Sequence, residues 1–174
     1  TAFHQTMPKQ NYIYPVPYDW YTKYGVRKYG FHGTSHKYIT NAMQEKLGKE
    51  DVNLIVCHIG SGSSIACVKD GKCYDTTMGL TPLDGLMMGT RCGAIDPAII
   101  PYIVNNCGIK VEDLNNFMNK KCGMQGISGV SSDFRDLWIA AEEGNKRAKL
   151  ALDMFIYQVK KYIGQYMAAL NGLD

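Results

Sequence analysis

The sequence contains no apolar run long enough to cross a membrane. Its longest, from Ala98 to Val104, is interrupted by Pro101, whereas a membrane helix needs roughly 20 apolar residues. An excess of one charge is also lacking, because 19 Lys and Arg against 16 Asp and Glu give a formal net charge of +3. This net charge is too small to indicate a surface that binds nucleic acid. We therefore expect neither a membrane nor a nucleic acid as a partner.

Signs of secretion are missing as well. The 6 cysteines form no C-x-x-C pair, and the chain has neither an N-x-S/T acceptor site nor a secretory segment at its start. This pattern is typical of a reduced, cytoplasmic protein. The chain starts at Thr1 rather than at Met and stops at Asp174, so we expect it to be part of something longer.

The first half of the chain changes its pattern twice. Residues 1–35, with Pro8, Pro15 and Pro17 among many tyrosines, predict an irregular segment that ends in a histidine loop. Helical spacing of apolar residues predicts a helix over 36–48, with Thr34 or Ser35 as N-cap and Gly48 as its stop. Three antiparallel strands follow within 53–77, at 53–58, 63–69 and 72–77, with Asp70 and Gly71 as one hairpin turn.

The second half is predicted to be helical. Residues 78–96 have no regular period and predict a long ordered loop, of the kind that often carries function. Residues 97–171 predict helices at 97–105, 111–120, 132–143 and 145–170. No linker interrupts the chain, so 1–174 is predicted to be a single α/β domain that lacks its usual further strands.

The strongest local signal is His58-Ile-Gly-Ser-Gly-Ser-Ser64, between the first two predicted strands. Glycines allow successive backbone N–H groups to turn toward one anion, and serine hydroxyls add donors. The segment therefore suits phosphate, although it is not a Walker A loop, because GxxxxGK[ST] is absent. A tight hairpin that binds nothing is the alternative.

Two histidines stand four residues apart in Tyr29-Gly-Phe-His-Gly-Thr-Ser-His36. Gly33 between them and the lack of a third nearby ligand argue against zinc. His32, between two glycines at a helix start, could instead donate a hydrogen bond to an anionic group. The alternative is that both histidines are structural.

Arg91 closes a glycine-rich, mostly apolar loop that begins at Met78. Its guanidinium suits a phosphoryl group or a carboxylate, and the apolar surroundings favour the rim of a pocket over a solvated surface arginine.

Further along, Ser131-Ser-Asp-Phe-Arg-Asp136 begins another helix, where capping alone explains Ser132 and Asp133.

Together these segments resemble the acetate kinase family of kinases that form acyl phosphates. Each is weak alone, but the combination is specific and spans nearly the whole chain. The matching stretches are Thr1–Pro8, Tyr29–His36, His58–Gly62, Asp75–Gly85, Met88–Arg91 and Ser131–Arg135.

The resemblance implies a ribonuclease H-like domain of the actin and Hsp70 type, incomplete here, with three antiparallel strands followed by several helices. It implies that the whole protein moves the terminal phosphoryl group of ATP to acetate, reversibly, giving acetyl phosphate and ADP with Mg²⁺. This chain would be the central part of such a protein, inactive by itself. A homodimer is the expected assembly.

The resemblance also assigns roles to individual residues. His32 would hydrogen-bond the phosphoryl oxygens and Arg91 would neutralise their charge, while His36 would support the loop. The phosphates of ATP would contact His58, Gly60, Ser61 and Gly62, and its adenosine would lie near Asp133, Phe134 and Arg135. Phe31 and Pro82 would line the pocket for the acetate methyl group.

The chain departs from the family pattern at two positions. Ser61 stands where the family usually has Asn, and Ala94 where it usually has an acidic residue. Several family residues lie outside the chain: an Asp just before Thr1, an Asn, an Arg and a His of the first domain, and a Glu linked to magnesium. We therefore expect the magnesium ligands mainly outside it, and no metal site within it.

Three alternatives stay open from the sequence. A propionate or butyrate kinase would share this scaffold, because one methylene in a pocket is worth only about 1–3 kcal/mol. A non-catalytic nucleotide-binding module would use the glycine-serine loop, with His32 and Arg91 as structural residues. A dimerisation segment would use only the apolar helix faces.

Overall fold

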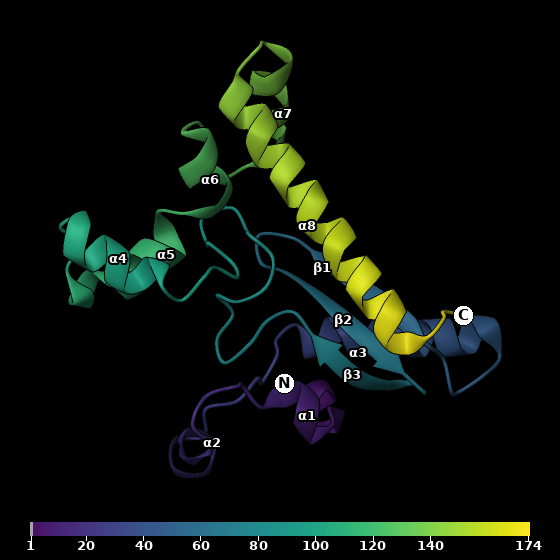
Figure 1. Ribbon diagram of the computed structural model, residues 1–174. Coiled ribbons are helices and arrows are strands. Elements are labelled where there is room, and N and C mark those ends of the chain that lie inside the picture. The colour runs from purple at the N-terminus through teal and green to yellow at the C-terminus, as the bar shows by residue number, and fades with distance from the viewer. Residues whose placement is uncertain (1) are drawn as a thin grey trace. The chain divides into compact units, whose positions relative to one another are not determined.

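The computed structural model in Figure 1 describes residues 2–174. Thr1, which opens the first of the matching stretches, lies outside the described residues. The chain divides into two compact units, unit 1 (Thr1–Gly85 with Lys160–Asp174) and unit 2 (Leu86–Val159). The single domain predicted for 1–174 stays a prediction. Within the described residues, no helix is both long and apolar enough to span a bilayer.

Unit 1 is built on a sheet of three antiparallel strands, in the order β1 (Leu54–Ile59), β2 (Ser63–Lys69) and β3 (Lys72–Thr76). The three predicted antiparallel strands are thus confirmed. The β1–β2 register pairs His58 with Ser64. The central strand β2 is buried along nearly its whole length, as expected for a strand covered on both faces.

Helices cover the two faces of this sheet. On one face, Leu54, Val56 and Val68 form a core with Val52, against which Met43 of α3 (Gly33–Leu47) packs. The last turns of α8 (Lys146–Leu170) lie on the opposite side in Figure 1, where Tyr166 is buried near Asp75. Strand alternation explains this division, since successive side chains of a strand point to opposite faces.

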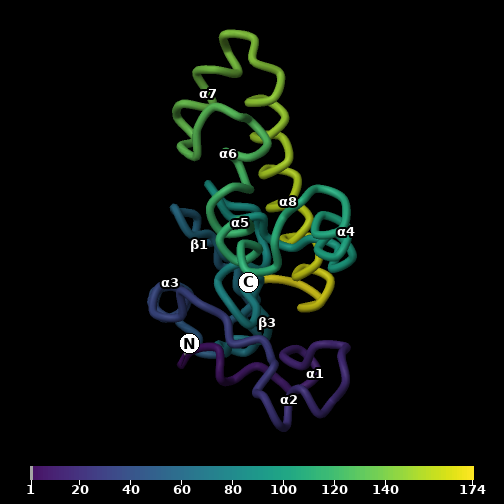
Figure 2. Tube along the Cα trace, turned by 90° about the vertical axis from the view of Figure 1, so that its left-hand side faces the viewer, coloured from purple at the N-terminus to yellow at the C-terminus, as the bar shows by residue number. Residues whose placement is uncertain are grey.

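The prediction of an irregular segment over 1–35 is wrong in part. The structure has η1 (Ala2–Thr6), α1 (Lys9–Tyr12) and α2 (Tyr18–Tyr24) there, and α1 and α2 lie side by side in Figures 1 and 2. The prolines start helices rather than break them, because Pro8 and Pro17 are the N-caps of α1 and α2. A proline at a helix start costs no hydrogen bond.

The predicted helix over 36–48 begins earlier than expected. Helix α3 starts at Gly33, and His32 is its N-cap instead of Thr34 or Ser35. Its other end agrees with the sequence, because Gly48 is the C-cap with a left-handed φ of 67°. Glycine adopts this conformation without the steric cost of a Cβ.

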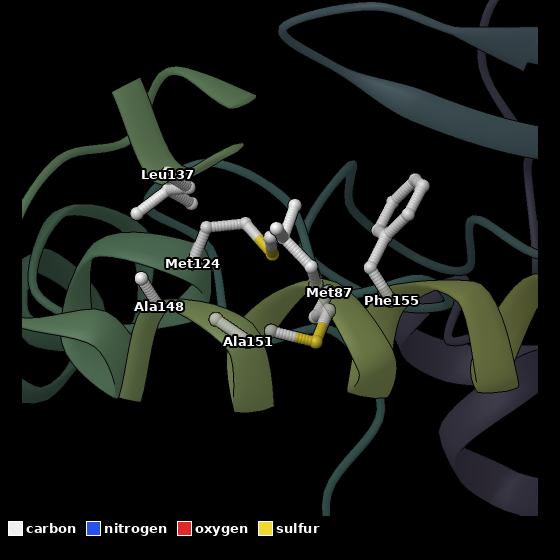
Figure 3. Packing of buried hydrophobic residues seen from close by; sticks show 7 residues of the cluster. Met87, Met124, Leu137, Ala148, Ala151 and Phe155 are labelled. Carbon is white, nitrogen blue, oxygen red and sulfur yellow. The ribbon is translucent and has the colours of Figure 1, made fainter. Parts of the chain in front are cut away.

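Unit 2 consists of helices around one apolar core. Helix α7 (Phe134–Glu142) and the start of α8 follow the predicted ranges closely, whereas the predicted helix over 111–120 is split into η2 (Val111–Asp113) and α5 (Leu114–Lys120). The other helices are α4 (Ile99–Asn106) and α6 (Gly123–Ser128), of which α6 was not predicted. Figure 3 shows the core, whose buried residues are Met87, Met124, Leu137, Ala148, Ala151, Leu152 and Phe155.

Candidate functional site

His32 stands at the start of α3 in an unusual backbone conformation. Its φ and ψ are 58° and 23°, in the left-handed region, which histidine enters more readily than most residues that carry a Cβ. Gly30, two residues earlier, has a φ of 71°, and a Cβ there would lie 2.6 Å from the ring of His4 and from Thr76 Cγ2. Residue 30 must therefore be glycine for the loop to pass between these side chains.

Three sets of contacts hold this histidine loop against the sheet. The backbone N–H groups of Tyr29 and Gly30 both donate to the carbonyl of Gly79, at 3.0 and 3.3 Å. Lys28 forms a half-buried ion pair with Asp75 of β3 at 2.6 Å. His4 Nε2 lies 2.8 Å from the carbonyl of Phe31. The position of His32 is thus fixed from both sides of the loop.

All 4 histidines of the chain gather at this place. The rings of His32 and His58 are stacked, with centroids 4.0 Å apart and an interplanar angle of 22°. His36 lies between the others, with its ring centroid 5.8 Å from that of His4 and 6.2 Å from that of His58. The structure therefore brings together His32 and His58, the residues predicted for phosphoryl transfer and for the phosphate loop.

Ser64 connects two of these rings. Its hydroxyl lies 2.9 Å from His32 Nδ1 and 2.7 Å from His36 Nε2, and Ser64 and His36 are both fully buried. His58 Nδ1 has its own partner, the Ser35 hydroxyl at 2.9 Å. Sequence reasoning placed Ser64 at the end of the phosphate loop and did not find this contact. The signal that could have found it is strand pairing, which sets Ser64 opposite His58.

Burial disfavours the charged form of the inner histidines of the cluster, His4 and His36. Desolvation by burial, followed by the neighbouring histidines, lowers the pKa of His36 from 6.5 to about 3. Burial likewise lowers the pKa of His4. A neutral imidazole carries one N–H donor and one acceptor. Of the residues that the structure describes, no three of His, Cys, Asp and Glu are grouped so that they could hold a metal ion.

The predicted phosphate loop is the hairpin turn between β1 and β2. The turn consists of Gly60, Ser61 and Gly62, which lie between Ile59 and Ser63, the last pair of residues across the two strands. The Ser63 hydroxyl donates to the carbonyl of Gly60 at 3.0 Å. A Cβ on Gly60 would make only ordinary contacts, at 3.5 Å or more. The chain's own packing therefore does not demand glycine here, and the open backbone suits the close approach of an anion.

Arg91 belongs to unit 2, where backbone hydrogen bonds fix its loop. Cys122 N–H donates to the carbonyl of Thr90 at 3.1 Å, and Met88 N–H donates to the carbonyl of Arg91 at 3.0 Å. The guanidinium Nη1 lies 3.6 Å from the sulfur of Met88. The conformation of the loop thus depends on the segment that precedes α6.

Gly123 allows the start of α6 to lie against the arginine loop. The sequence analysis did not single out this glycine. Its φ is 62°, and a Cβ there would collide with the carbonyl oxygens of Met88 and Arg91. The arginine loop also approaches the start of α7, because a Cβ on Gly89 would lie 3.1 Å from the carbonyl oxygen of Ser132. The signal for Gly123 in the sequence was weak, since one glycine without a periodic context indicates only a turn.

Asp133 is the N-cap of α7, as the sequence predicted. Its carboxylate accepts hydrogen bonds from the backbone N–H of Arg135 at 2.8 Å and from the Arg135 guanidinium at 2.7 Å. These bonds lower the pKa of Asp133 to about 2. The Phe134 ring packs against Phe155 at 4.8 Å, so this side chain belongs to the core. A role of these three residues toward adenosine stays a prediction.

The remaining predicted residues are placed as follows. Phe31 and Pro82 lie in unit 1 and are half-buried, and Ala94 lies in unit 2 and is exposed. His32 belongs to unit 1 and Arg91 to unit 2, so their convergence on one phosphoryl group stays a prediction.

Comparison with known proteins shows which family the chain resembles. Residues 1–174 match the profile of the Acetokinase family. The chain is 59% identical over 174 residues to an acetate kinase of Finegoldia magna and 60% identical over 176 residues to one of Acetivibrio thermocellus. In both cases the whole chain is covered, together with 44% of the relative. The chain thus spans less than half the length of these curated relatives.

Solved structures agree with this match. A crystal structure of Porphyromonas gingivalis acetate kinase superimposes on the whole chain with a TM-score of 0.96 at 48% identity, covering 44% of that protein. A propionate kinase from Francisella tularensis superimposes on 99% of the chain with a TM-score of 0.95 at 48% identity, covering 45% of that protein. These neighbours have the actin- and Hsp70-like α/β fold, so the predicted fold class is confirmed.

Proposed function

Because this chain belongs to the acetokinase family over its whole length, we propose that the complete protein is an ATP-dependent acetate kinase. The observation that carries the proposal is the cluster in which His32 stacks on His58 at 4.0 Å, directly beside the hairpin loop Gly60–Gly62. The loop that we propose to bind phosphate and the histidine that we propose as donor to the transferred group are neighbours within unit 1.

The proposed reaction is a direct transfer between two oxygens. An oxygen of the acetate carboxylate forms a bond to the γ-phosphorus of ATP, while the bond from that phosphorus to the β–γ bridging oxygen breaks. The electron pair of the broken bond leaves with ADP, and the product is acetyl phosphate. No proton has to be removed from the carboxylate, so the protein contributes positioning and charge stabilisation rather than a base.

In this proposal the two predicted groups act on the oxygens of the migrating phosphoryl group. His32 donates a hydrogen bond to them, and the Arg91 guanidinium offsets their negative charge, as a planar cation with several donors is suited to do. The backbone of Gly60, Ser61 and Gly62, with His58 beside it, holds the phosphates of ATP. Asp133, Phe134 and Arg135 border the adenosine, and Phe31 and Pro82 border the acetate methyl group.

The proposal extends to the setting of the enzyme. Mg²⁺ accompanies ATP and neutralises phosphate charge when bound. We expect its ligands mainly in parts of the complete protein outside this chain. The composition with 6 unpaired cysteines favours the cytoplasm, and the apolar helix faces favour a homodimer.

Propionate is the second candidate acceptor. A propionate kinase is among the structural neighbours at 48% identity, the same identity as the acetate kinase neighbour. One methylene changes binding by only about 1–3 kcal/mol. The acceptor is therefore to be decided by comparing kcat/KM for acetate, propionate and butyrate in the complete protein.

The decisive experiment is Arg91→Ala in the complete protein, with formation of acyl hydroxamate as the assay. Loss of a group that stabilises transition-state charge typically lowers kcat by roughly 100-fold to 1,000-fold. We expect such a fall in kcat, with the affinity for ATP changed little. Unchanged turnover would overturn the proposal in favour of a nucleotide-binding module.

Arg27→Ala is the matched control for this experiment. The Arg27 guanidinium lies 3.6 Å from the centre of the Tyr12 ring and has no assigned part in the reaction. This variant removes the same charge and number of donors, so we expect it to keep the activity of the unmodified protein. A comparable loss in both variants would show that the effect of Arg91→Ala is general rather than specific.

A further inference from the structure

Ser64 and His36 lie behind His32, on the side of the ring that carries Nδ1. The Ser64 hydroxyl bridges His32 Nδ1 at 2.9 Å and His36 Nε2 at 2.7 Å. Ser64 and His36 are both fully buried. The proton positions on the Ser64 hydroxyl and on His36 Nε2 therefore depend on each other and on His32 Nδ1.

The donor and acceptor inventory limits how they can be shared. A serine hydroxyl has one proton to donate, and a neutral imidazole has one N–H. His36 is neutral, because burial lowers its pKa to about 3. Its other nitrogen, Nδ1, has no hydrogen-bond partner among the described residues. If Nδ1 carried the proton, a buried N–H would be left without an acceptor, which is rare and costly.

The proton of His36 therefore belongs on Nε2, where it is donated to the Ser64 oxygen. The hydroxyl proton of Ser64 is then directed to His32 Nδ1, its other neighbour. If His32 Nδ1 also carried a proton, the buried hydroxyl of Ser64 would lose its acceptor. His32 consequently accepts at Nδ1 and carries its own proton on Nε2.

We propose that Ser64 and His36 are positioning residues that hold His32 as the Nε2–H tautomer by a directed chain of hydrogen bonds, from His36 Nε2 through the Ser64 hydroxyl to His32 Nδ1. The chain also fixes the plane of the His32 ring, already stacked on His58 at 4.0 Å. As a result the donor of His32 is set before any substrate arrives. This inference rests on the proposed function only where it assigns the phosphoryl group as the acceptor of that donor.

The tautomer is tested by nitrogen NMR of the complete protein labelled with ¹⁵N-histidine. We expect the Nδ1 of His32 to have the shift of a pyridine-type nitrogen and its Nε2 that of a pyrrole-type nitrogen, with the same pattern for His36. A protonated Nδ1 on His32, or a doubly protonated ring at neutral pH, overturns the inference. Because this measurement needs no turnover, it decides the tautomer even if the protein proves not to be a kinase.

The positioning role is tested by Ser64→Ala in the same protein. Removing a group that orients a functional histidine typically costs 10-fold to 100-fold. We expect kcat to fall by about this factor, the KM for ATP to stay within about twofold, and the His32 nitrogen shifts to move toward a mixture of tautomers. Full activity together with unchanged His32 shifts overturns the inference.

Two further variants guard against a general loss of structure. His36→Gln keeps an amide N–H near the position of Nε2, so we expect it to retain more activity and more of the His32 pattern than His36→Leu; equal losses would contradict the directed chain. Thr40→Val removes another buried hydroxyl, one that donates to the backbone carbonyl of His36 at 2.8 Å. It should leave kcat and the His32 shifts unchanged.

Discussion

At the scale of single residues, His32 combines two features that serve a hydrogen-bond donor. Its backbone is in the left-handed region, with φ at 58°, at the N-cap of α3, and the Ser64 hydroxyl lies 2.9 Å from its Nδ1. Strained conformations of this kind persist where the surroundings determine them fully. Here Gly30, which has no room for a Cβ, and the paired strands supply that constraint.

The buried histidines make stability depend on pH. His36 stays neutral in the folded protein until about pH 3, whereas an exposed imidazole takes up a proton near 6.5. Unfolding therefore binds a proton between these values, and the free energy of unfolding falls by about 1.4 kcal/mol for each pH unit below 6.5. We expect His36 alone to cost roughly 2 kcal/mol of stability by pH 5.

Urea unfolding at pH 7 and at pH 5 measures this effect, with His36→Gln as the comparison. The glutamine variant cannot take up the proton, so its loss of stability between the two pH values should be smaller by that amount. Parallel losses in the two proteins would contradict a neutral His36. His4, whose pKa is also lowered, contributes in the same direction to both proteins and cancels.

Residue-level prediction from the sequence succeeded where local chemistry was decisive. The cap at Asp133 and the stop at Gly48 follow from short-range rules, and both agree with the structure. The partner of His32 could not be predicted in this way, because Ser64 is 32 residues away. The contact depends on the register of a hairpin and on where α3 packs, which residue types alone do not determine.

At the scale of elements, Gly123 is the first residue of α6 and lies directly against the arginine loop. A Cβ there would collide with the carbonyl oxygen of Met88, and φ is 62°. Gly123→Ala should destabilise the protein by about 3 kcal/mol, from overpacking and a left-handed alanine together. Because the Arg91 loop has to move, we also expect kcat of the complete protein to fall.

Gly108→Ala is the control for this change. Gly108 has a similar φ of 68°, but nothing lies within 4 Å of a Cβ placed on it. It should cost only the conformational part, about 1 kcal/mol, and leave kcat as it was. Thermal unfolding and hydroxamate formation measure both variants; equal effects would mean that the close approach at Gly123 is unimportant.

Element boundaries were predictable where hydrophobic periodicity was long. Strand β2 and the 25-residue helix α8 follow their predicted ranges. The short helices α1, α2 and α6 were missed, since a helix of 4 to 7 residues has at most two turns, too few to show a recurring apolar pattern. Prolines that start such helices look the same in sequence as prolines that interrupt them.

At the scale of the whole molecule, the chain spans 44% of the length of its acetate kinase relatives. Phosphoryl transfer depends on several charged groups placed around the same phosphate, and the resemblance assigns some of them to regions outside this sequence. We therefore expect the 174-residue chain, produced separately, to form no detectable acyl hydroxamate from ATP and acetate, while the complete protein does.

Circular dichroism of the separate chain should accompany that assay, so that loss of activity is not confused with loss of folding. Turnover by a folded 174-residue chain would show that His32, Arg91 and the loop at Gly60 suffice for catalysis.

The family and the fold class could be predicted from ordered motifs, whereas the division into two compact units could not, because no linker composition marks it.

The register of the β1–β2 hairpin has one more consequence. His58 and Ser64 are partners across the strands, so any change in the turn between them has to keep the number of its residues. A single inserted residue that shifted the register would carry the serine hydroxyl to the opposite side of the sheet, away from both imidazoles. The length of this loop is therefore set by the position that the Ser64 hydroxyl has to keep.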